Sequence, residues 1–414
     1  MPGVGGGPVR HGFEYAASPV RRTAEPWRSE RYTAGVKLEQ FAMERMQSTW
    51  ENLVDYNLSE SGVHPLTPRE LLGDDALDVV LDQPLVYTQS NGTVALRALV
   101  AAQFAGADET NIQVTNGGSE ANYLAVWNIV EPGDEVALLV PNYMQTWGLA
   151  RAFGGIVKEW HLIEDGAAGR WRPDLDELAR IVSDRTRLII ICTPNNPTGA
   201  RLASDELDAI AAIADRHGSW VLSDEVYRGA ELDGVETASM WGRSERVIVT
   251  GGLSKAYGLP GLRIGWIAGP APFVASTWSY HDYTTIAPGA LSDRLACVAM
   301  QPDQRQQLFE RTRSILRTNL PLIEEWLRAH APSFAWIPPE AGAIIYARYQ
   351  YPINSTELVT RLRDEKSVLV VPGDHFGMDG YLRLGFGERP AYLREGLDRV
   401  HDLLTSLALS PAAS

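Results

Sequence analysis

Two basic side chains whose types and spacing could do chemistry together, Lys255 and Arg263, stand eight residues apart. The apolar run from Arg246 to Thr250 precedes them and predicts a buried strand, and the two glycines after it allow a sharp turn. An amine in such surroundings is a candidate for a depressed pKa, and only a neutral amine attacks a carbonyl. A fixed guanidinium can bind a phosphate through two hydrogen bonds. The pair suggests pyridoxal phosphate held as a Schiff base on Lys255. A solvated lysine beside an ion-paired arginine is the alternative.

A carboxylate that could assist lies in the run from Trp220 to Tyr227, which predicts another strand. Asp224 and Glu225 fall on opposite sides of that strand, because side chains alternate along it. A carboxylate paired with the pyridine nitrogen keeps the ring protonated, so that the ring accepts electrons from a substrate carbon. We assign this role to Asp224 and keep Glu225 as its rival.

An anion site is predicted where a strand pattern, Ile112 to Thr115, runs into Gly117, Gly118 and Ser119 and then into a helix pattern. Backbone N–H groups at a helix N-terminus suit a phosphate, because they are free donors at the positive end of the helix dipole. A glycine pair before a helix is common, so this signal is weak alone.

The elements that must position these groups alternate between strand and helix, which indicates a mostly parallel sheet covered on both faces. From about residue 300 the sequence becomes more helical and charged. The pattern predicts further strands at 135–140, 187–192, 367–373 and 381–386. It also predicts a long amphipathic helix at 304–330.

The chain has 414 residues, more than one typical domain. We expect a large domain over 88–299 that would bind the cofactor, and a small domain built from 31–87 and 300–414. Residues 1–30 are rich in Gly and Arg without clear periodicity, so we expect a flexible N-terminal extension there.

The charge balance and the cysteines exclude several classes of partner. The net charge of −15 argues against a nucleic acid or an anionic membrane as the main partner. Cys192 and Cys297 provide neither a disulfide framework nor metal-ligand spacing, so no metal is expected. No run is long enough to span a membrane, and the N-terminus lacks the apolar core of a signal peptide, which predicts a cytoplasmic location.

The lysine segment also carries a family resemblance. Ser254, Lys255, Gly261, Arg263 and Gly265 match the pattern Ser-Lys-x-x-x-x-x-Gly-x-Arg-x-Gly of the class I/II aminotransferases, which are fold-type I pyridoxal phosphate enzymes. Further segments match in the family's order, over roughly residues 50 to 400. The resemblance implies an α/β fold with a mostly parallel central sheet in the large domain, and a smaller α+β domain.

For the cofactor, the resemblance implies roles for several residues. The aromatic ring of Tyr143 would stack on the pyridine ring. Asn196, from the segment Asn196-Pro-Thr-Gly199, and Tyr227 would hydrogen-bond the phenolic oxygen. Gly118, Ser119 and Glu120 complete this side of the cofactor site.

For the substrate and the partner subunit, the resemblance implies a second set. The segment with Gly62 and Val63 would pass over a free amino acid, Asn196 would also face it, and Arg383 would clamp its α-carboxylate. Tyr87 would cross a dimer interface to the neighbour's phosphate, which predicts a homodimer with shared active sites; an ordinary half-buried tyrosine is the alternative.

One position departs from the family's pattern. Many relatives carry a phosphate-binding serine or threonine three residues before the lysine, where this chain has Gly252. Ser254 or Thr250 could substitute, and the sequence does not choose between them.

The expected reaction is transamination of a free α-amino acid through an external aldimine, with Lys255 as the base that takes the Cα proton. Segments 58–64, 254–263 and 368–373 also resemble capreomycidine synthases, and the 1-aminocyclopropane-1-carboxylate synthases share the same apparatus. The alternative is therefore β- or γ-elimination with cyclisation or replacement in specialised metabolism, for example on an arginine derivative or S-adenosylmethionine.

A third reading is a non-catalytic cofactor-binding sensor like those fused to helix-turn-helix regulators. The acidic balance and the short stretch before residue 38 speak against it. Because the candidate reactions share these motifs, we expect the outcome to depend on pocket positions near 61–64 and 281–283.

Overall fold

An eight-stranded sheet dominates the computed structural model, which describes residues 37–73 and 77–409. Its strand order is β2-β9-β8-β7-β6-β3-β4-β5. The five strands from β8 to β4 run parallel, whereas β9 and β5 pair antiparallel to their neighbours. The strands are β2 Ile112–Thr115, β3 Glu135–Val140, β4 Ile156–Asp165, β5 Arg170–Pro173, β6 Thr186–Cys192, β7 Trp220–Asp224, β8 Val247–Gly252 and β9 Gly265–Ala268.

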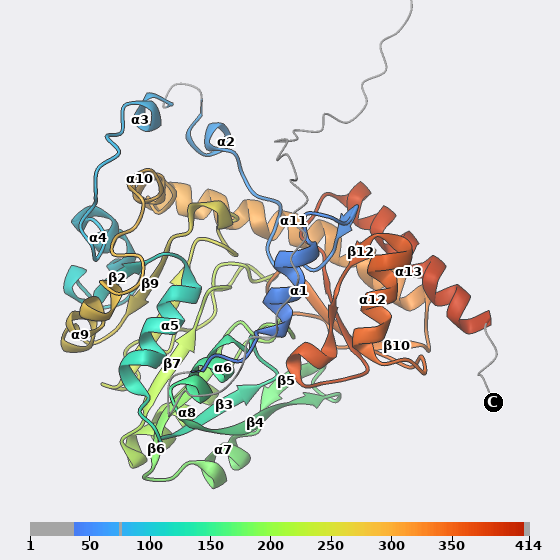
Figure 1. Cartoon of the computed structure of the whole chain (residues 1–414), viewed down its shortest axis with the longest axis horizontal. Helices are drawn as coiled ribbons and strands as arrows, with labels where there is room; N and C mark the ends of the chain where they lie inside the picture. The colour runs from blue at the N-terminus through green and yellow to red at the C-terminus, as the bar shows by residue number, and fades with distance from the viewer. Residues whose placement is uncertain (1–36, 74–76, 410–414) are drawn as a thin grey trace, which may run out of the picture. The chain divides into compact units, whose positions relative to one another are not determined.

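Both faces of this sheet are buried, which explains the continuous apolar runs of its central strands. In β6, Leu188 and Ile190 pack into one hydrophobic core, whereas Ile189 and Ile191 pack into the other. Helices cover both faces (Figure 1). They are α4 Val94–Ala101, α5 Gly118–Ile129, α6 Gln145–Ala152, α7 Leu175–Ile181, α8 Ser204–His217 and α9 Ala271–His281.

A four-stranded antiparallel sheet forms from the last third of the chain, in the order β10-β11-β14-β13. Its strands are β10 Phe334–Trp336, β11 Ile344–Tyr349, β13 Val371–Pro372 and β14 Tyr381–Gly385. A separate parallel pair joins β1 Tyr56–Asn57 to β12 Val368–Leu369 and so ties the early chain to this region. The remaining helices are α1 Ala42–Trp50, α2 Pro68–Leu72, α3 Asp78–Leu81, α10 Ala290–Ala299, α11 Pro302–Ala329, α12 Ser355–Lys366 and α13 Pro390–Leu409.

These elements confirm the predicted α/β class with a large, mostly parallel sheet and a smaller α+β part. The strand predicted over Trp220 to Tyr227 is too long, because it ends at Asp224, whose Oδ1 accepts a hydrogen bond from the Val226 N–H at 3.1 Å and turns the chain. The domain boundaries remain a prediction, and the extension predicted over 1–30 lies outside the described residues. None of the described helices combines the length and apolar character needed to cross a membrane.

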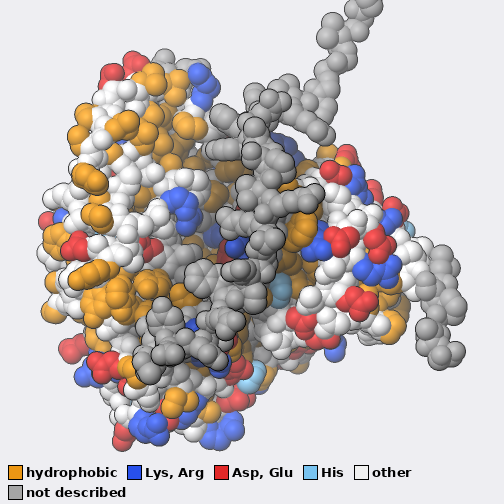
Figure 2. Space-filling model, viewed as in Figure 1, with side chains coloured by type: hydrophobic (Ala, Val, Ile, Leu, Met, Phe, Trp, Pro, Cys, Tyr) orange, Lys and Arg blue, Asp and Glu red, His pale blue; other side chains and the backbone are white. Residues whose placement is uncertain are grey.

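An apolar surface patch lies on the side of the molecule where α3, α4, α9 and α10 are found, and Figure 2 shows hydrophobic side chains spread over it. Two chain segments, 81–94 and 278–291, supply its exposed side chains. Two hydrogen bonds join these segments: Thr88 Oγ1 donates to the Pro288 carbonyl at 2.8 Å, and Trp278 Nε1 donates to Ser90 Oγ at 2.7 Å. Its exposed hydrophobic members are Leu81, Leu85, Val86, Tyr87, Val94, Trp278, Tyr283, Ile286 and Leu291.

Candidate active site

A cavity of about 300 Å³ opens at the carboxyl ends of β6, β7 and β8, beside the N-terminus of α5. Ligands of open α/β sheets bind at such strand ends. Residues from α1 and β14 also line it, so both sheets contribute to its walls. The lining residues are Met43, Glu44, Gln47, Glu51, Glu60, Ser61, Gly118, Ser119, Asn122, Tyr143, Cys192, Asn196, Asp224, Val226, Tyr227, Ser254, Lys255, Pro260, Arg263 and Arg383.

The amine of Lys255 donates to a carboxylate that the sequence analysis missed. Its Nζ lies 2.7 Å from Glu60 Oε1, and the N–H groups of Ser61 and Gly62 donate to the same oxygen at 2.9 Å. Burial alone would raise the pKa of Glu60, but Lys255 and the Gly62 N–H hold that pKa at about 2.

The same ion pair decides the charge of the lysine. Burial lowers the pKa of the Lys255 amine, but the Glu60 carboxylate outweighs burial and leaves the pKa raised. The depressed pKa predicted from the apolar surroundings is therefore wrong for this state, because a partner from a distant segment keeps the amine protonated.

Asp224 lies in the cavity and is held by an amide. Asn122 Nδ2 donates to Asp224 Oδ2 at 2.8 Å, and Thr250 Oγ1 donates to Asn122 Oδ1 at 2.7 Å. Burial raises the pKa of Asp224. None of the described Lys, Arg or His side chains comes within 4.0 Å of its carboxylate, so this half-buried acid faces the cavity without a described cation.

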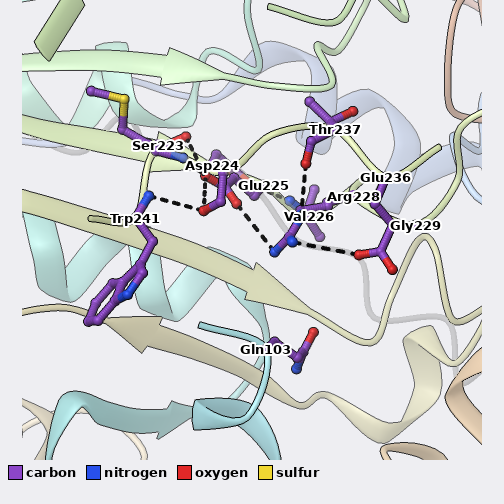
Figure 3. Close-up of polar contacts among 12 residues, drawn as sticks. Gln103, Ser223, Asp224, Glu225, Val226, Arg228, Gly229, Glu236, Thr237 and Trp241 are labelled. Atoms are coloured by element: carbon purple, nitrogen blue, oxygen red, sulfur yellow. Dashed lines mark hydrogen bonds and ion pairs between the residues drawn. The ribbon is translucent and has the colours of Figure 1, made fainter. Parts of the chain in front are cut away.

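The rival carboxylate of Glu225 does not line the cavity. It accepts hydrogen bonds from the Ser239 hydroxyl at 3.0 Å and the Met240 N–H at 2.8 Å, and Figure 3 shows Arg228 between Glu225 and Glu236. Glu225 is thus committed to a structural network on the other side of the strand end.

A cradle for an anion forms where Arg263 packs on the glycines before α5. Gly117 has a left-handed φ of 86°, and a Cβ placed there would clash with Nη2 and lie 2.9 Å from Cζ of Arg263. The guanidinium makes one described hydrogen bond, from Nη1 to the Pro260 carbonyl at 3.2 Å. Its other donors and the first N–H groups of α5 are available to a ligand.

The hydroxyls of Ser254 and Thr250, the two candidates for the missing phosphate contact, have different surroundings. Ser254 lines the cavity, whereas the Thr250 hydroxyl is committed to Asn122 and does not line it. A Cβ on Gly252 would lie only 3.1 Å from the Ile264 carbonyl oxygen, so a larger residue has little room there.

Arg383 and Tyr227 bring unpaired polar atoms to the cavity. Arg383, which is 1% exposed, donates to Asn196 Oδ1 at 2.8 Å and to the Ser59 carbonyl at 2.5 Å, and no described residue partners its Nε. Burial lowers the pKa of Arg383. Tyr227 is 2% exposed, and among the described residues no group meets its hydroxyl with hydrogen-bonding geometry. Burial raises the pKa of Tyr227, and the nearby Ser61 side chain is among the groups that oppose this rise. Buried polar atoms of this kind require a partner.

Tyr143 also lines the cavity. Its ring meets Phe41 edge-on at 5.0 Å, and its hydroxyl donates to Glu44 Oε1 at 2.8 Å. The ring is therefore fixed in orientation beside the cavity, as stacking on a planar ligand would require.

Four predicted residues do not line the cavity with their side chains. The carboxylate of Glu120 accepts from the Asn116 N–H and from Thr284 and Thr285, so only its backbone lies near the anion cradle. Val63 is buried in the core, and Gly62 contributes its N–H to Glu60. Tyr87 is 88% exposed in the apolar patch.

The positions expected to separate the reaction outcomes are mostly structural. His64 pairs with Arg311 at 3.0 Å, and buried His281 contacts Gln113 and Thr285. Neither lines the cavity, and neither does Tyr283; Ser61 does. Of the residues that the sequence analysis missed, Asn122 follows Gly118 by four residues on the same helix face, a spacing that could have identified it.

Comparisons with known proteins agree with this arrangement. The model of the family "Aminotransferase class I and II" matches residues 82–400. Capreomycidine synthase of Streptomyces vinaceus is 35% identical over 84% of this chain and 89% of its own, and an aspartate aminotransferase of Streptomyces avermitilis is 29% identical over 77% and 81%. A solved PLP-dependent aminotransferase from Streptococcus suis superposes with a TM-score of 0.83 at 31% identity, covering 90% of this chain and 99% of that one.

Proposed function

The chain is an enzyme of the class I and II aminotransferase family, and from that premise we propose that it binds pyridoxal 5'-phosphate on Lys255 and transfers the amino group of a free α-amino acid. The observation that carries the proposal is that one cavity gathers Lys255, Asp224, Tyr227, Arg263 and Arg383. These are the groups that an aldehyde, a pyridine nitrogen, a phenolic oxygen, a phosphate and a carboxylate require.

The unmet polar groups of the cavity support the fit to this cofactor. Asp224 is a half-buried acid without a cation among the described residues, and a protonated pyridine nitrogen would supply one. The unpartnered Tyr227 hydroxyl, together with the Asn196 amide, would donate to the phenolic oxygen. The cradle of Arg263 and the α5 N-terminus, with Ser254, would hold the phosphate.

When bound, the cofactor supplies an aldehyde that condenses with amines and a ring that accepts electron density from the substrate's Cα. Arg383 would orient the amino acid by its α-carboxylate. Lys255, once neutral, would take the Cα proton and return it elsewhere. Because Glu60 holds the lysine in its protonated form, transfer of that proton must precede the attack by the amine.

We also propose that the enzyme is a homodimer. Tyr87 is 88% exposed within the apolar patch defined above, and a large exposed apolar patch on a soluble protein marks an interaction site. A second copy seated on this patch would bury it and could carry Tyr87 to the neighbouring cavity. Light scattering that gives a monomer mass for fully active enzyme would contradict this. The cytoplasmic location remains a prediction.

A second outcome, elimination with ring closure or replacement, is favoured by the 35% identity to capreomycidine synthase. The two are separated by a single turnover with excess enzyme. Transamination should release a keto acid and leave the cofactor in its amine form. If a true substrate is consumed while the cofactor returns as the aldehyde, without added keto acid, the eliminating reaction replaces our first choice.

A further inference from the structure

One wall of the cavity is acidic. Glu44 and Gln47 on α1 and Glu51 at its C-cap follow one another at helical spacing, and all three line the cavity together with Glu60. We call Glu44, Glu51 and Glu60 the acidic wall. Among the described residues, no Lys, Arg or His lies within 4.0 Å of Glu44 or Glu51, and Glu60 is paired only with Lys255.

Local electrostatics make this wall costly to keep. Glu51 is the C-cap of α1, where the helix dipole is negative and a cation is favoured, and the last turn of α1 holds no basic residue. Burial, and then Glu60 and Glu44, raise the pKa of Glu51, while Lys255 opposes them. A positive charge placed between the three carboxylates would relieve this repulsion.

The cations of the cavity are assigned to other partners by the proposed function. Arg263 would face the phosphate, Arg383 the α-carboxylate, and Lys255 the aldehyde. When the Lys255 amine is used by the cofactor, Glu60 loses its ion-pair partner. The acidic wall is then left without any described cation.

The wall begins where the amino acid would be anchored. Met43, at the start of α1, touches Arg383, with Nη1 lying 3.6 Å from Sδ. Arg383 lines the same cavity, and its buried Nε has no partner among the described residues, which indicates an anionic ligand at this end. From there α1 extends the wall by about 1.5 Å per residue toward Glu51.

We propose that the acidic wall selects an amino acid whose side chain carries a cation, a guanidinium or an alkylammonium. This rests on the proposed function, since the α-carboxylate must bind Arg383. A guanidinium has five donors in a planar fork and suits several carboxylates at once, so it is the better fit of the two.

The test is calorimetric binding to the holoenzyme of carboxylic acids that lack the α-amino group and any other primary amine, so that they form no Schiff base. The matched pair is 5-guanidinopentanoate and its neutral isostere 5-ureidopentanoate, with 6-(dimethylamino)hexanoate as the ammonium arm. We expect the guanidino acid to bind at least about tenfold more tightly than the ureido acid, as hydrogen bonds to charged groups imply. If the ammonium acid binds more tightly than the guanidino acid, the cationic class stands and the preferred head group is an ammonium. If the ureido acid binds as tightly as the guanidino acid or more tightly, the proposal is overturned.

Variants locate the effect. Glu51→Gln and Glu44→Gln should each weaken binding of the guanidino acid roughly tenfold and leave the ureido acid within about twofold. The control is Glu39→Gln, because Glu39 pairs with Arg151 outside the cavity. Equal losses for both acids would overturn the assignment to charge. Cofactor absorbance and thermal unfolding verify folding, and a protein that takes up no cofactor on Lys255 refutes the proposed function rather than this inference.

Discussion

Lys255 Nζ and Glu60 Oε1 lie 2.7 Å apart and hold each other in their charged forms. The amine that would bind an aldehyde is therefore stored as an ammonium, on a carboxylate that two backbone N–H groups also fix. Attachment of the cofactor requires this ion pair to open.

Glu60→Gln tests that role and keeps the acceptor oxygen for the Ser61 and Gly62 N–H groups. Removal of the negative charge should lower the pKa of Lys255, because the Glu60 carboxylate favours the ammonium form and burial opposes it. The midpoint pH of cofactor attachment, measured by cofactor absorbance as a function of pH, should therefore be lower in this variant than in the wild type. An unchanged or higher midpoint would contradict the ion pair's control of the amine, and Glu39→Gln should move nothing.

Gly117→Ala tests the anion cradle. The new Cβ must displace the Arg263 guanidinium, so the affinity for the cofactor should fall at least about tenfold. The control is Gly133→Ala, because Gly133 has a similar φ of 93° but open space around it. Both variants should lose about 1–2 kcal/mol of stability from backbone strain. Equal cofactor affinity in the two variants would contradict the assignment of the anion cradle to phosphate binding.

Arg383→Ala should weaken binding of amino acids by at least about a hundredfold and leave cofactor content intact, because it leaves an α-carboxylate without its buried partner. The corresponding decarboxylated amines provide the comparison, since they have no carboxylate to lose. Should amines and amino acids lose affinity equally, Arg383 would have another role.

Acid stability should depend on Glu120, although its carboxylate does not face the cavity. Burial alone would raise the pKa of Glu120, but hydrogen bonds from His281 and Thr284 and the Asn116 N–H hold that pKa at about 2, below the ordinary 4.5. A lowered pKa stabilises the fold above pH 4.5, and that stability is lost as the pH falls toward 2. Glu120→Gln should cost at most about 3 kcal/mol at pH 7. The difference from the wild type in free energy of unfolding should shrink between pH 5 and pH 3; a constant difference would contradict it.

Much of the fold and site was predictable because its signals are local. The apolar runs before Asp224 and Lys255 mark buried parallel strands, and the turns after them place both residues at one sheet edge. The glycines before α5 and Arg263 were also assigned to an anion from the sequence alone, and the structure places them in contact.

The rest depends on contacts between distant segments. Glu60 reaches Lys255 because β1 pairs with β12, which lies 312 residues further along the chain (Tyr56 with Val368), and no local pattern records that pairing. The choice between Ser254 and Thr250 needed the partner of each hydroxyl, since Asn122 takes one of them. The pKa of Lys255 was mispredicted for the same reason, because its neighbours in sequence are apolar and its decisive neighbour in space is a carboxylate.

The most direct measurement is to identify the lysine that carries the cofactor. The chain has four lysines, Lys37, Lys158, Lys255 and Lys366, so reduction of the holoenzyme with borohydride and peptide mapping distinguish them fully. Our account predicts a pyridoxyl mass on the peptide that contains Lys255 and on no other. A pyridoxyl group on another lysine, or a holoenzyme that gives no adduct, would contradict it.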